Sequence, residues 1–289
     1  MKLHVETNEK HPSFMAKFLP KKKAWRVILG ITATLFVILL IHITHALTLD
    51  RIIQYREIRY RSTRVPQDLC GIRIAFISDT HNDTSEETLY DIVEQLNSMN
   101  IDILLLGGDY TTYNIHLART MQILSTVETT YGIFGVDGNH DNHLILFPLM
   151  QAFGLTPLDN SGVRVREGLF IAGVQDLWTR SPNIAQSIRY AHEDDFILLL
   201  THNPDVTMHQ DTSRVDFVLS GHTHGGQISF FGLFSPGTYM VSEYGQRFIG
   251  WGSTADGTRT FSGNGIGGGA TPRVFARPQV VILTLTSRA

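Results

Sequence analysis

The sequence of 289 residues contains one cysteine, Cys70, and no lysine beyond Lys23. A single cysteine cannot form a disulfide within the chain, and it excludes a metal site built from several thiolates. Any metal must therefore be held by His, Asp, Glu or Asn. The lack of lysine after residue 23 argues against nonspecific nucleic-acid binding by the rest of the chain, because neutralising phosphates requires Lys and Arg.

Charge is divided unevenly along the chain. Residues 1–64 carry 12 Lys and Arg against 4 Asp and Glu, whereas residues 65–289 carry 12 against 23. This division predicts a basic N-terminal segment, residues 1–23, that lies near anionic lipid, followed later by an acidic soluble domain. Apolar residues make up 43% of the chain, so that domain can bury a sizeable core.

An apolar stretch runs from residue 24 to residue 49, and residues 27–41 contain no charged residue. Roughly 20 apolar residues cross the bilayer core as a helix, so we expect a single transmembrane helix and a location in the cell membrane. A cleaved signal peptide and a buried core helix remain as alternatives. The orientation is also open, because the lysines before the helix favour a cytoplasmic N-terminus and the arginines after it oppose this. These arginines are Arg51, Arg56, Arg59, Arg61 and Arg64.

Residues 50–71 are expected to be a juxtamembrane linker. Within it, residues 50–62 mix Arg with Ile and Tyr, which fits a helix lying on anionic headgroups. The alternative is a continuation of the transmembrane helix that leads into the first strand. A globular domain is expected from residue 72 to residue 289.

Short apolar runs alternate with helical patterns in the first part of that domain, which predicts βαβ units and a largely parallel sheet. Expected strands are residues 72–78, 103–106, 131–136, 163–165, 169–174, 196–200, 217–219 and 280–286. Thr84 and Glu87 form a capping box for one helix, residues 115–127 form a second, and Ser181-Pro182 opens a third that continues to about His192. The strand density predicts an α/β fold with two packed sheets and helices outside.

Five short motifs fall at or just after the expected strand ends, where α/β sheets form their sites. They are Asp79-Thr80-His81, Gly107-Gly108-Asp109, Gly138-Asn139-His140-Asp141, Thr201-His202-Asn203 and Gly221-His222-Thr223-His224. Each motif alone is a weak signal, but five in this order at strand ends are not expected by chance. Their Asp, His and Asn side chains suit Mn, Fe, Zn, Co or Ni better than Ca or Mg.

This series of motifs resembles the calcineurin-like metallophosphoesterase superfamily over about residues 72 to 285. The segments HNPD, at residues 202–205, and GHTHGGQ, ending at Gln227, are similar to its bacterial membrane-associated branch. The resemblance implies a four-layer αββα sandwich, here with an N-terminal transmembrane helix. It also implies a metal-dependent hydrolase of phosphoric esters or diphosphates with two divalent transition-metal ions, such as Mn, Fe or Zn.

The resemblance assigns roles to matching positions. Asp79, His81 and His224 would hold the first metal. Asn139, His202 and His222 would hold the second, and Asp109 would bridge both. A carboxylate shared by two dications fits the two-metal chemistry of phosphoryl transfer.

The resemblance leaves His140 free for catalysis, because its neighbour Asn139 is a ligand and adjacent side chains point differently. We expect His140 to stabilise the transition state and to protonate the leaving oxygen. Asp141 is expected either to orient and charge that imidazole, which would make it a catalytic residue, or to cap the local loop. Tyr110 is expected to pack rather than to contact substrate.

Residues 263–269 have the sequence GNGIGGG. They could present backbone N–H groups to a phosphate, or form a flexible loop. The lack of a following Lys-Ser or Lys-Thr excludes a P-loop nucleotide cradle. The resemblance makes Arg273, which follows this loop, a candidate substrate-binding residue that clamps a phosphate by bidentate pairing.

The motifs and the apolar stretch together predict hydrolysis of a phosphodiester or pyrophosphate bond in a phosphorylated, lipid-linked substrate at a membrane, with no nucleic-acid partner. One version resembles the UDP-2,3-diacylglucosamine diphosphatases of lipid A synthesis, and it requires a cytoplasmic catalytic domain. Alternatives from other classes are a metal-binding scaffold without catalysis and a nuclease, and the acidic domain argues against the nuclease.

Overall fold

The computed structural model describes residues 22–81, 84–111, 116–268 and 271–288. The chain divides into two compact units, Met1–Thr44 and His45–Ala289. Helix α1 (Lys22–Leu47) forms the described part of the first unit, and its last turn, from His45 on, belongs to the second. The residues of the second unit carry all the motifs identified in the sequence.

Helix α1 is long and apolar enough to cross a membrane. The candidate span is Ala24–Arg51, with a mean hydropathy of 2.5 in its most apolar window, and that window is fully exposed. This exposure contradicts the alternative of a buried core helix. A membrane span and a signal sequence both fit this length and composition.

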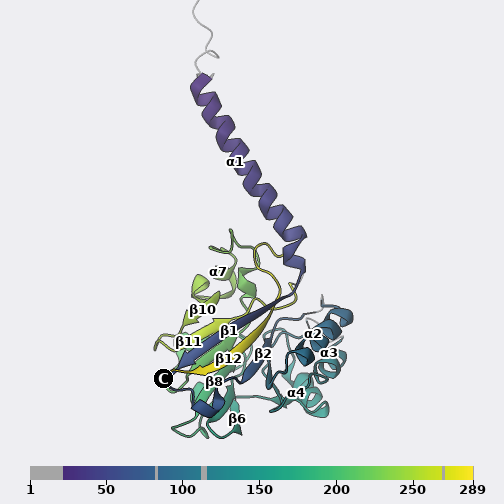
Figure 1. Cartoon of the computed structure of the whole chain (residues 1–289), viewed down its shortest axis with the longest axis vertical. Helices are drawn as coiled ribbons and strands as arrows, with labels where there is room; N and C mark the ends of the chain where they lie inside the picture. Colours follow the sequence, from purple (N-terminus) through teal and green to yellow (C-terminus); the bar gives the residue numbers. More distant parts are fainter. Residues whose placement is uncertain (1–21, 82–83, 112–115, 269–270, 289) are drawn as a thin grey trace, which may run out of the picture. The chain divides into compact units, whose positions relative to one another are not determined.

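The second unit contains two six-stranded mixed sheets (Figure 1). The first has the order β1 (Gln54–Ser62), β12 (Gln279–Ser287), β2 (Arg73–Ile77), β3 (Ile103–Leu106), β4 (Ile133–Gly135) and β5 (Thr156–Pro157). The second has the order β10 (Gly250–Ser253), β11 (Arg259–Ser262), β9 (Phe217–Ser220), β8 (Phe196–Thr201), β7 (Leu169–Gly173) and β6 (Ser161–Arg166). Strands β2, β3 and β4 are parallel to one another, and so are β7, β8 and β9.

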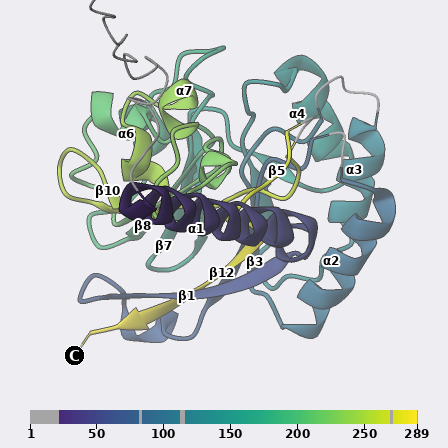
Figure 2. The same cartoon turned by 90° about the horizontal axis from the view of Figure 1, so that it is seen from above.

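Alternation of apolar side chains along the strands creates four layers. One face of each sheet contributes to a shared core, to which Phe76, Phe134, Leu198 and Leu219 belong. The outer face of the first sheet packs against α2 (Glu86–Ser98), α3 (Leu117–Leu124) and α4 (His143–Ala152), which lie on the same side in Figures 1 and 2. The short helices α5 (Ile184–Ser187) and α6 (Val206–His209) cover the second sheet. The expected αββα sandwich is confirmed.

Three local expectations were wrong or only partly met. Helix α2 is capped by Ser85, which accepts a hydrogen bond from the Thr88 N–H, whereas the Thr84 hydroxyl bonds to the Thr80 carbonyl. The helix expected from residue 181 to residue 192 is only the single turn α5, which begins after its N-cap Asn183. The helix expected over residues 115–127 is α3, and Ile115 lies outside the described residues.

The largest correction concerns residues 50–62, for which both expectations were helical. Residues 54–62 instead form β1, an edge strand that runs parallel to β12 in register from Gln54 opposite Gln279 to Ser62 opposite Ser287. Alternating Arg and apolar side chains fit a strand with one buried face, and Ile58 turns into the shared core. Arg59 and Arg61 are exposed and alternate with Ile58 and Tyr60, as in a strand, whereas Arg56 is half-buried on the same face as Ile58.

Replacing Ile58 with Ala should lower the free energy of unfolding by about 2–4 kcal/mol, because it removes a buried side chain from the core between the sheets. Urea unfolding of the full chain in detergent, followed by tryptophan fluorescence, measures this. The exposed neighbour Arg59 provides the control, and Arg59→Ala should change stability by no more than about 0.5 kcal/mol. Equal, small effects at both positions would show that β1 is not part of the core.

Candidate metal centre

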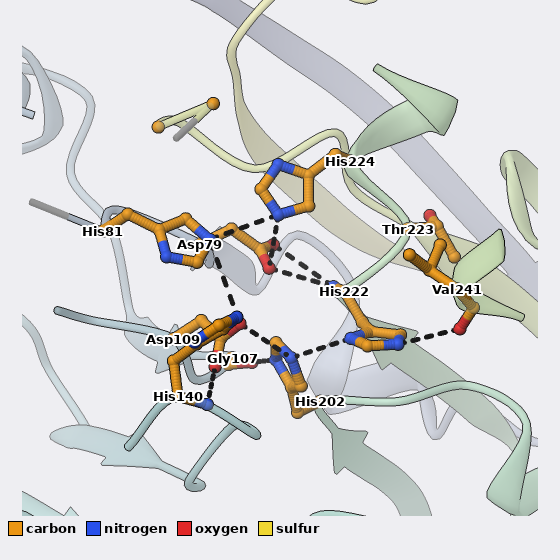
Figure 3. A network of polar contacts seen from close by, with 12 residues as sticks. Asp79, His81, Gly107, Asp109, His140, His202, His222, Thr223, His224 and Val241 are labelled. Carbon is orange, nitrogen blue, oxygen red and sulfur yellow. Dashed lines mark hydrogen bonds and ion pairs between the residues drawn. The ribbon is translucent and has the colours of Figure 1, made fainter. Parts of the chain in front are cut away.

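The five motifs meet because they follow strands whose carboxyl ends share one edge of the sandwich. Asp79, Asp109 and Asn139 follow β2, β3 and β4 of the first sheet. His202 and His222 follow β8 and β9 of the second. Figure 3 shows side chains from both sheets in one network of polar contacts. The two sheets thus supply opposite walls of a single site.

One group of converging atoms comes from Asp79, His81 and His224. The Nε2 atoms of His81 and His224 are 3.2 Å apart, and the His224 Nε2 lies 3.5 Å from the Asp79 Oδ1. The ligand atoms of the three residues all lie within 4.8 Å of one another, a spacing at which one metal ion could be held.

A second group surrounds the Nε2 of His202. This atom lies 3.1 Å from the Asn139 Oδ1, 3.2 Å from the His222 Nδ1 and 3.3 Å from the Asp109 Oδ2. The same Oδ2 lies 3.9 Å from the His81 Nε2 of the first group. The Asp109 carboxylate therefore stands between the two groups, as a bridging ligand must.

Hydrogen bonds to the backbone orient two of the imidazoles. His202 Nδ1 lies 2.8 Å from the Gly107 carbonyl oxygen, and His222 Nε2 lies 2.9 Å from the Val241 carbonyl oxygen (Figure 3). Each carbonyl can only accept, so each of these nitrogens carries a proton when the ring is neutral. The remaining nitrogen of each ring then directs its lone pair into the site, as a metal ligand requires.

The charges at the site also fit a cation. Burial raises the pKa of Asp109, but His202 and His81 outweigh this and hold it well below its usual range. Burial lowers the pKa of His224 to about 4, which leaves its ring neutral near pH 7. Burial lowers the pKa of His202 too, yet Asp109 and Asp79 raise it well above its usual value. The two buried carboxylates thus attract positive charge, and a divalent cation would compete with the His202 proton for it.

The backbone is unusual at these positions. Five residues with side chains in the site have positive φ angles between 47° and 67°, namely Asp79, His81, Asp109, His222 and His224. Non-glycine residues rarely adopt this left-handed conformation, and such strain gathers where the surrounding structure imposes it for function. All five lie two to four residues after the end of β2, β3 or β9.

His140 lies at the mouth of the site. Its side chain is exposed, and its ring is 5.4 Å from the ring of His81 between centroids. The His140 N–H donates to the Asp109 Oδ1 over 2.8 Å, so its backbone fixes the residue, which also lines a cavity next to the ligand groups. Its catalytic role stays a prediction.

Asp141 makes the contacts that we expected if it caps the local loop. Its carboxylate accepts hydrogen bonds from the N–H groups of Gly138, Asp109 and Tyr110 at 2.7–3.0 Å. Burial, with the Asp109 carboxylate, raises its pKa to about 8. Tyr110 is fully buried, and its hydroxyl contacts backbone carbonyls, so the expectation that it packs is confirmed. The action of Asp141 on the His140 ring stays a prediction.

Arg273 lies beside His224 and does not line the cavity that His140 lines. Its guanidinium donates to the carbonyl oxygens of Gly267, Ala276 and His224, and one nitrogen lies 3.4 Å from the His224 Nδ1. These contacts position His224. Phosphate clamping by Arg273 stays a prediction. In the structure the guanidinium holds the backbone around His224.

The glycine loop supports Asp79. The N–H groups of Ile266 and Gly267 donate to the carbonyl oxygens of Ser78 and Asp79. Gly265 has φ +69°, and a Cβ there would lie 2.6 Å from the Asp79 Cβ, so only glycine fits. These two N–H groups are therefore occupied by the backbone that presents Asp79, and Gly269 lies outside the described residues.

A cavity of about 640 Å³ opens above the two ligand groups. Motif residues such as His140 and Asn139 line one part of it, and Trp178, Ile228, Met240 and Val241 line an apolar part, called the second wall below. The sequence reasoning missed this second wall. Trp178 could have been found by its place shortly after β7, which is parallel to β8 and ends at the same edge. The other three carry no motif.

The model of the calcineurin-like phosphoesterase family matches residues 72–226, more than half of the chain. The chain belongs to this family. The match ends just after the last of the five motifs, so this metallophosphoesterase shares with the family the part that builds the site.

Similar proteins carry the same family name. An uncharacterized metallophosphoesterase of Helicobacter pylori (strain ATCC 700392 / 26695) is 31% identical over 174 residues, which are 56% of this chain and 47% of the relative. The uncharacterized metallophosphoesterase YkuE of Bacillus subtilis (strain 168) is 27% identical over 250 residues, 81% of this chain and 86% of the relative. A Danio rerio protein called "Transmembrane protein with metallophosphoesterase domain" is 26% identical over 215 residues, which are 64% of this chain and 49% of the relative.

The chain spans about half the length of the Helicobacter pylori relatives that it matches. Family membership and the clustered ligands make divalent metal binding the shared property of this site.

Replacing Asp109 with Ala should reduce bound transition metal by a factor of about ten or more, because both groups lose the carboxylate that lies between them. Elemental analysis of the purified full chain after dialysis against Mn²⁺ or Zn²⁺ measures this. Asp159, which is exposed and lies outside both groups, provides the control Asp159→Ala. Unchanged metal content in Asp109→Ala would refute a shared carboxylate.

Proposed function

We propose that this chain is a membrane-anchored phosphoesterase that uses two divalent transition-metal ions to hydrolyse a phosphodiester or pyrophosphate bond in a lipid-associated substrate. The observation that carries the proposal is the place of the Asp109 carboxylate between two groups of His, Asp and Asn side chains. Asp79, His81 and His224 would hold one ion, and a second set would hold the other. That second set is Asn139, His202 and His222.

Two such ions, when bound, neutralise charge on the phosphoryl oxygens and acidify a water nucleophile. The chain's own residues set up this chemistry. Asp79 and Asp109 supply the buried negative charge that retains the ions, and the backbone contacts of His202 and His222 fix which nitrogen faces inward. The cavity shields the reacting groups from bulk water on the side of Trp178 and Val241.

His140 is the residue best placed to donate a proton. Its ring lines the cavity beside the first ligand group, and the bond from its N–H to Asp109 fixes it relative to the ligands. In its protonated form, the imidazole stabilises charge that develops on the phosphoryl group and transfers its proton to the leaving oxygen.

The lipid-associated substrate is supported by the apolar helix and by the second cavity wall. Helix α1 meets the length and composition of a membrane span, and the Danio rerio relative is named as a transmembrane protein. The wall that contains Ile228 and Met240 is apolar, unlike the ligand groups that line the rest of the cavity. An amphiphilic phosphoester fits such a cavity, with its phosphoryl group on the ligands and its apolar part on this wall.

His140→Ala should lower kcat for bis(p-nitrophenyl) phosphate by about 10²–10⁴-fold, because a positioned proton donor is lost. Its metal content should stay the same, because the ring belongs to neither ligand group. Steady-state kinetics with elemental analysis test both. His143, the first residue of α4, provides the control, and His143→Ala should retain full turnover. Unchanged kcat in His140→Ala would remove His140 from the reaction.

Removing metal with EDTA should abolish hydrolysis of phosphodiesters, and adding back Mn²⁺, Fe²⁺ or Zn²⁺ should restore it. Under the same conditions, UDP-2,3-diacylglucosamine tests the pyrophosphate version of the proposal by release of UMP. Release of UMP would identify a diphosphatase, and hydrolysis of model diesters without UMP would favour a lipid phosphodiester. A metal-loaded protein that cleaves none of these substrates would point to the non-catalytic scaffold.

A further inference from the structure

The segment of residues 228–240 is a loop that runs into the short helix α7 (Thr238–Val241), and it carries a cluster of exposed apolar side chains next to the metal centre. From Gly225 to Ser242 the chain contains no Asp, Glu, Lys or Arg. Leu233 and Met240 are each 85% exposed, and several neighbours are exposed as well. They are Ile228, Phe230, Phe231, Phe234 and Tyr239. Contiguous apolar surface of this kind marks an interaction site in a soluble domain.

The backbone of this segment is held in place, so the exposure is built into the fold. The Phe230 N–H donates to the Phe234 carbonyl oxygen over 2.7 Å, which closes a tight turn. The Ser235 hydroxyl contacts the carbonyl oxygens of Gly226 and Ile228, each at 2.6 Å. These bonds fix a loop whose aromatic and aliphatic side chains point outward.

The loop lies next to the point where the apolar helix ends. The ring of Phe231 is 5.3 Å from that of Phe275, and the Phe275 ring stacks on His45 at 3.9 Å, between centroids. His45 begins the last turn of α1, and the first charged residue after it is Asp50. Two ring contacts thus join the loop to the last turn of α1.

A second observation places the cavity above the metal centre close to the last turn of α1. Gly268 and Thr271 line the cavity above the metal centre, and they also line a neighbouring cavity of about 410 Å³ whose walls include Ala46 and Leu47. The catalytic cavity and the cavity lined by the last turn of α1 therefore share two wall residues.

We propose that residues 228–240 form a lipid-docking loop that inserts its apolar side chains into the membrane surface and opens the catalytic cavity onto it. This inference rests on the membrane anchoring proposed above, and it identifies the face of the catalytic domain that meets the lipid. Aromatic and aliphatic side chains at the end of a span are those that partition into the interface.

Charge supports lipid as the occupant. A cavity of about 340 Å³ beside the loop is lined by Gly232 and Phe275 together with Arg56 and Arg277. Arginines around an apolar loop attract anionic headgroups, whereas the domain as a whole is acidic. Apolar side chains flanked by arginines match an anionic bilayer, which offers both an apolar interior and negatively charged headgroups.

The loop also connects docking with catalysis. Ile228, Pro236, Gly237 and Met240 belong to the loop and line the catalytic cavity. A lipid substrate would therefore reach the metal centre with its phosphoryl group while its acyl chains stay in the bilayer. The membrane would form part of the entrance to the site.

The single cysteine makes the test direct. In a Cys70→Ser background, Leu233→Cys is labelled with an environment-sensitive fluorophore, and the full chain is reconstituted into vesicles of phosphatidylglycerol and phosphatidylethanolamine that contain doxyl-labelled lipid. Tyr190→Cys provides the matched control, because Tyr190 is also an exposed apolar side chain but lies outside the loop. We expect at least about a twofold quenching at position 233 and almost none at position 190.

Equal quenching at the two positions, or none at position 233, would overturn the proposal. Shielding of position 233 that depends on protein concentration but not on doxyl lipid would assign the loop to a second copy of the chain, which also overturns it. Neither result depends on turnover, so the loop proposal can fail while the proposed hydrolase activity stands.

A kinetic comparison tests the link to catalysis. Leu233→Asp combined with Phe230→Asp should raise KM for hexadecyl p-nitrophenyl phosphate in vesicles about tenfold or more, because a charge replaces each apolar contact with lipid. Turnover of water-soluble methyl p-nitrophenyl phosphate should change by less than about twofold, because neither side chain lines the cavity. Equal KM for the vesicle substrate in the variant and the parent would overturn the link. Failure of the parent chain on both substrates would instead refute the proposed function.

Discussion

The rest of the site depends on the Asp109 carboxylate. One oxygen accepts the His140 N–H, and the other lies within 4 Å of the Nε2 atoms of His202 and His81. A single side chain thereby connects His140 to both ligand groups and links the two sheets, since Asp109 follows β3 and His202 follows β8. Burial of this negative charge is unfavourable unless positive charge compensates it, so the same residue creates the demand for cations.

The surroundings of Asp109 fix its position at a cost in backbone strain. Its φ of 56° is unfavourable for a residue with a side chain, and the Asp141 carboxylate stabilises it by accepting the N–H groups of Asp109 and Tyr110. A Cβ at Gly138 would clash with the Asp109 Oδ1. The loop after β4 can therefore come this close to Asp109 only because residue 138 is glycine. Neighbouring motifs thus support each other's geometry, and this explains why they occur as a set.

Much of this architecture was predictable from local pattern. Apolar runs marked β2, β3, β8 and β9, and the residues that follow these strands carry the ligands. The failures came where local pattern is ambiguous. Arginines alternating with apolar residues fit a surface helix as well as an edge strand, and only pairing with β12 makes residues 54–62 a strand. The apolar cavity wall was missed because Ile228 and Met240 carry no reactive group, and their value lies in position alone.

By itself, the sequence determined the chemistry available to this protein: one cysteine, no lysine beyond residue 23, five motifs with metal-binding side chains and one apolar stretch long enough for a membrane. It could do so because residue types and short spacings are local properties. The tertiary structure alone decided which nitrogen of each imidazole faces the site, that Arg273 binds backbone carbonyls beside His224, and that residues 228–240 lie beside the end of α1. These outcomes depend on contacts between segments far apart in the chain, and such contacts form only when both sheets close on their shared core.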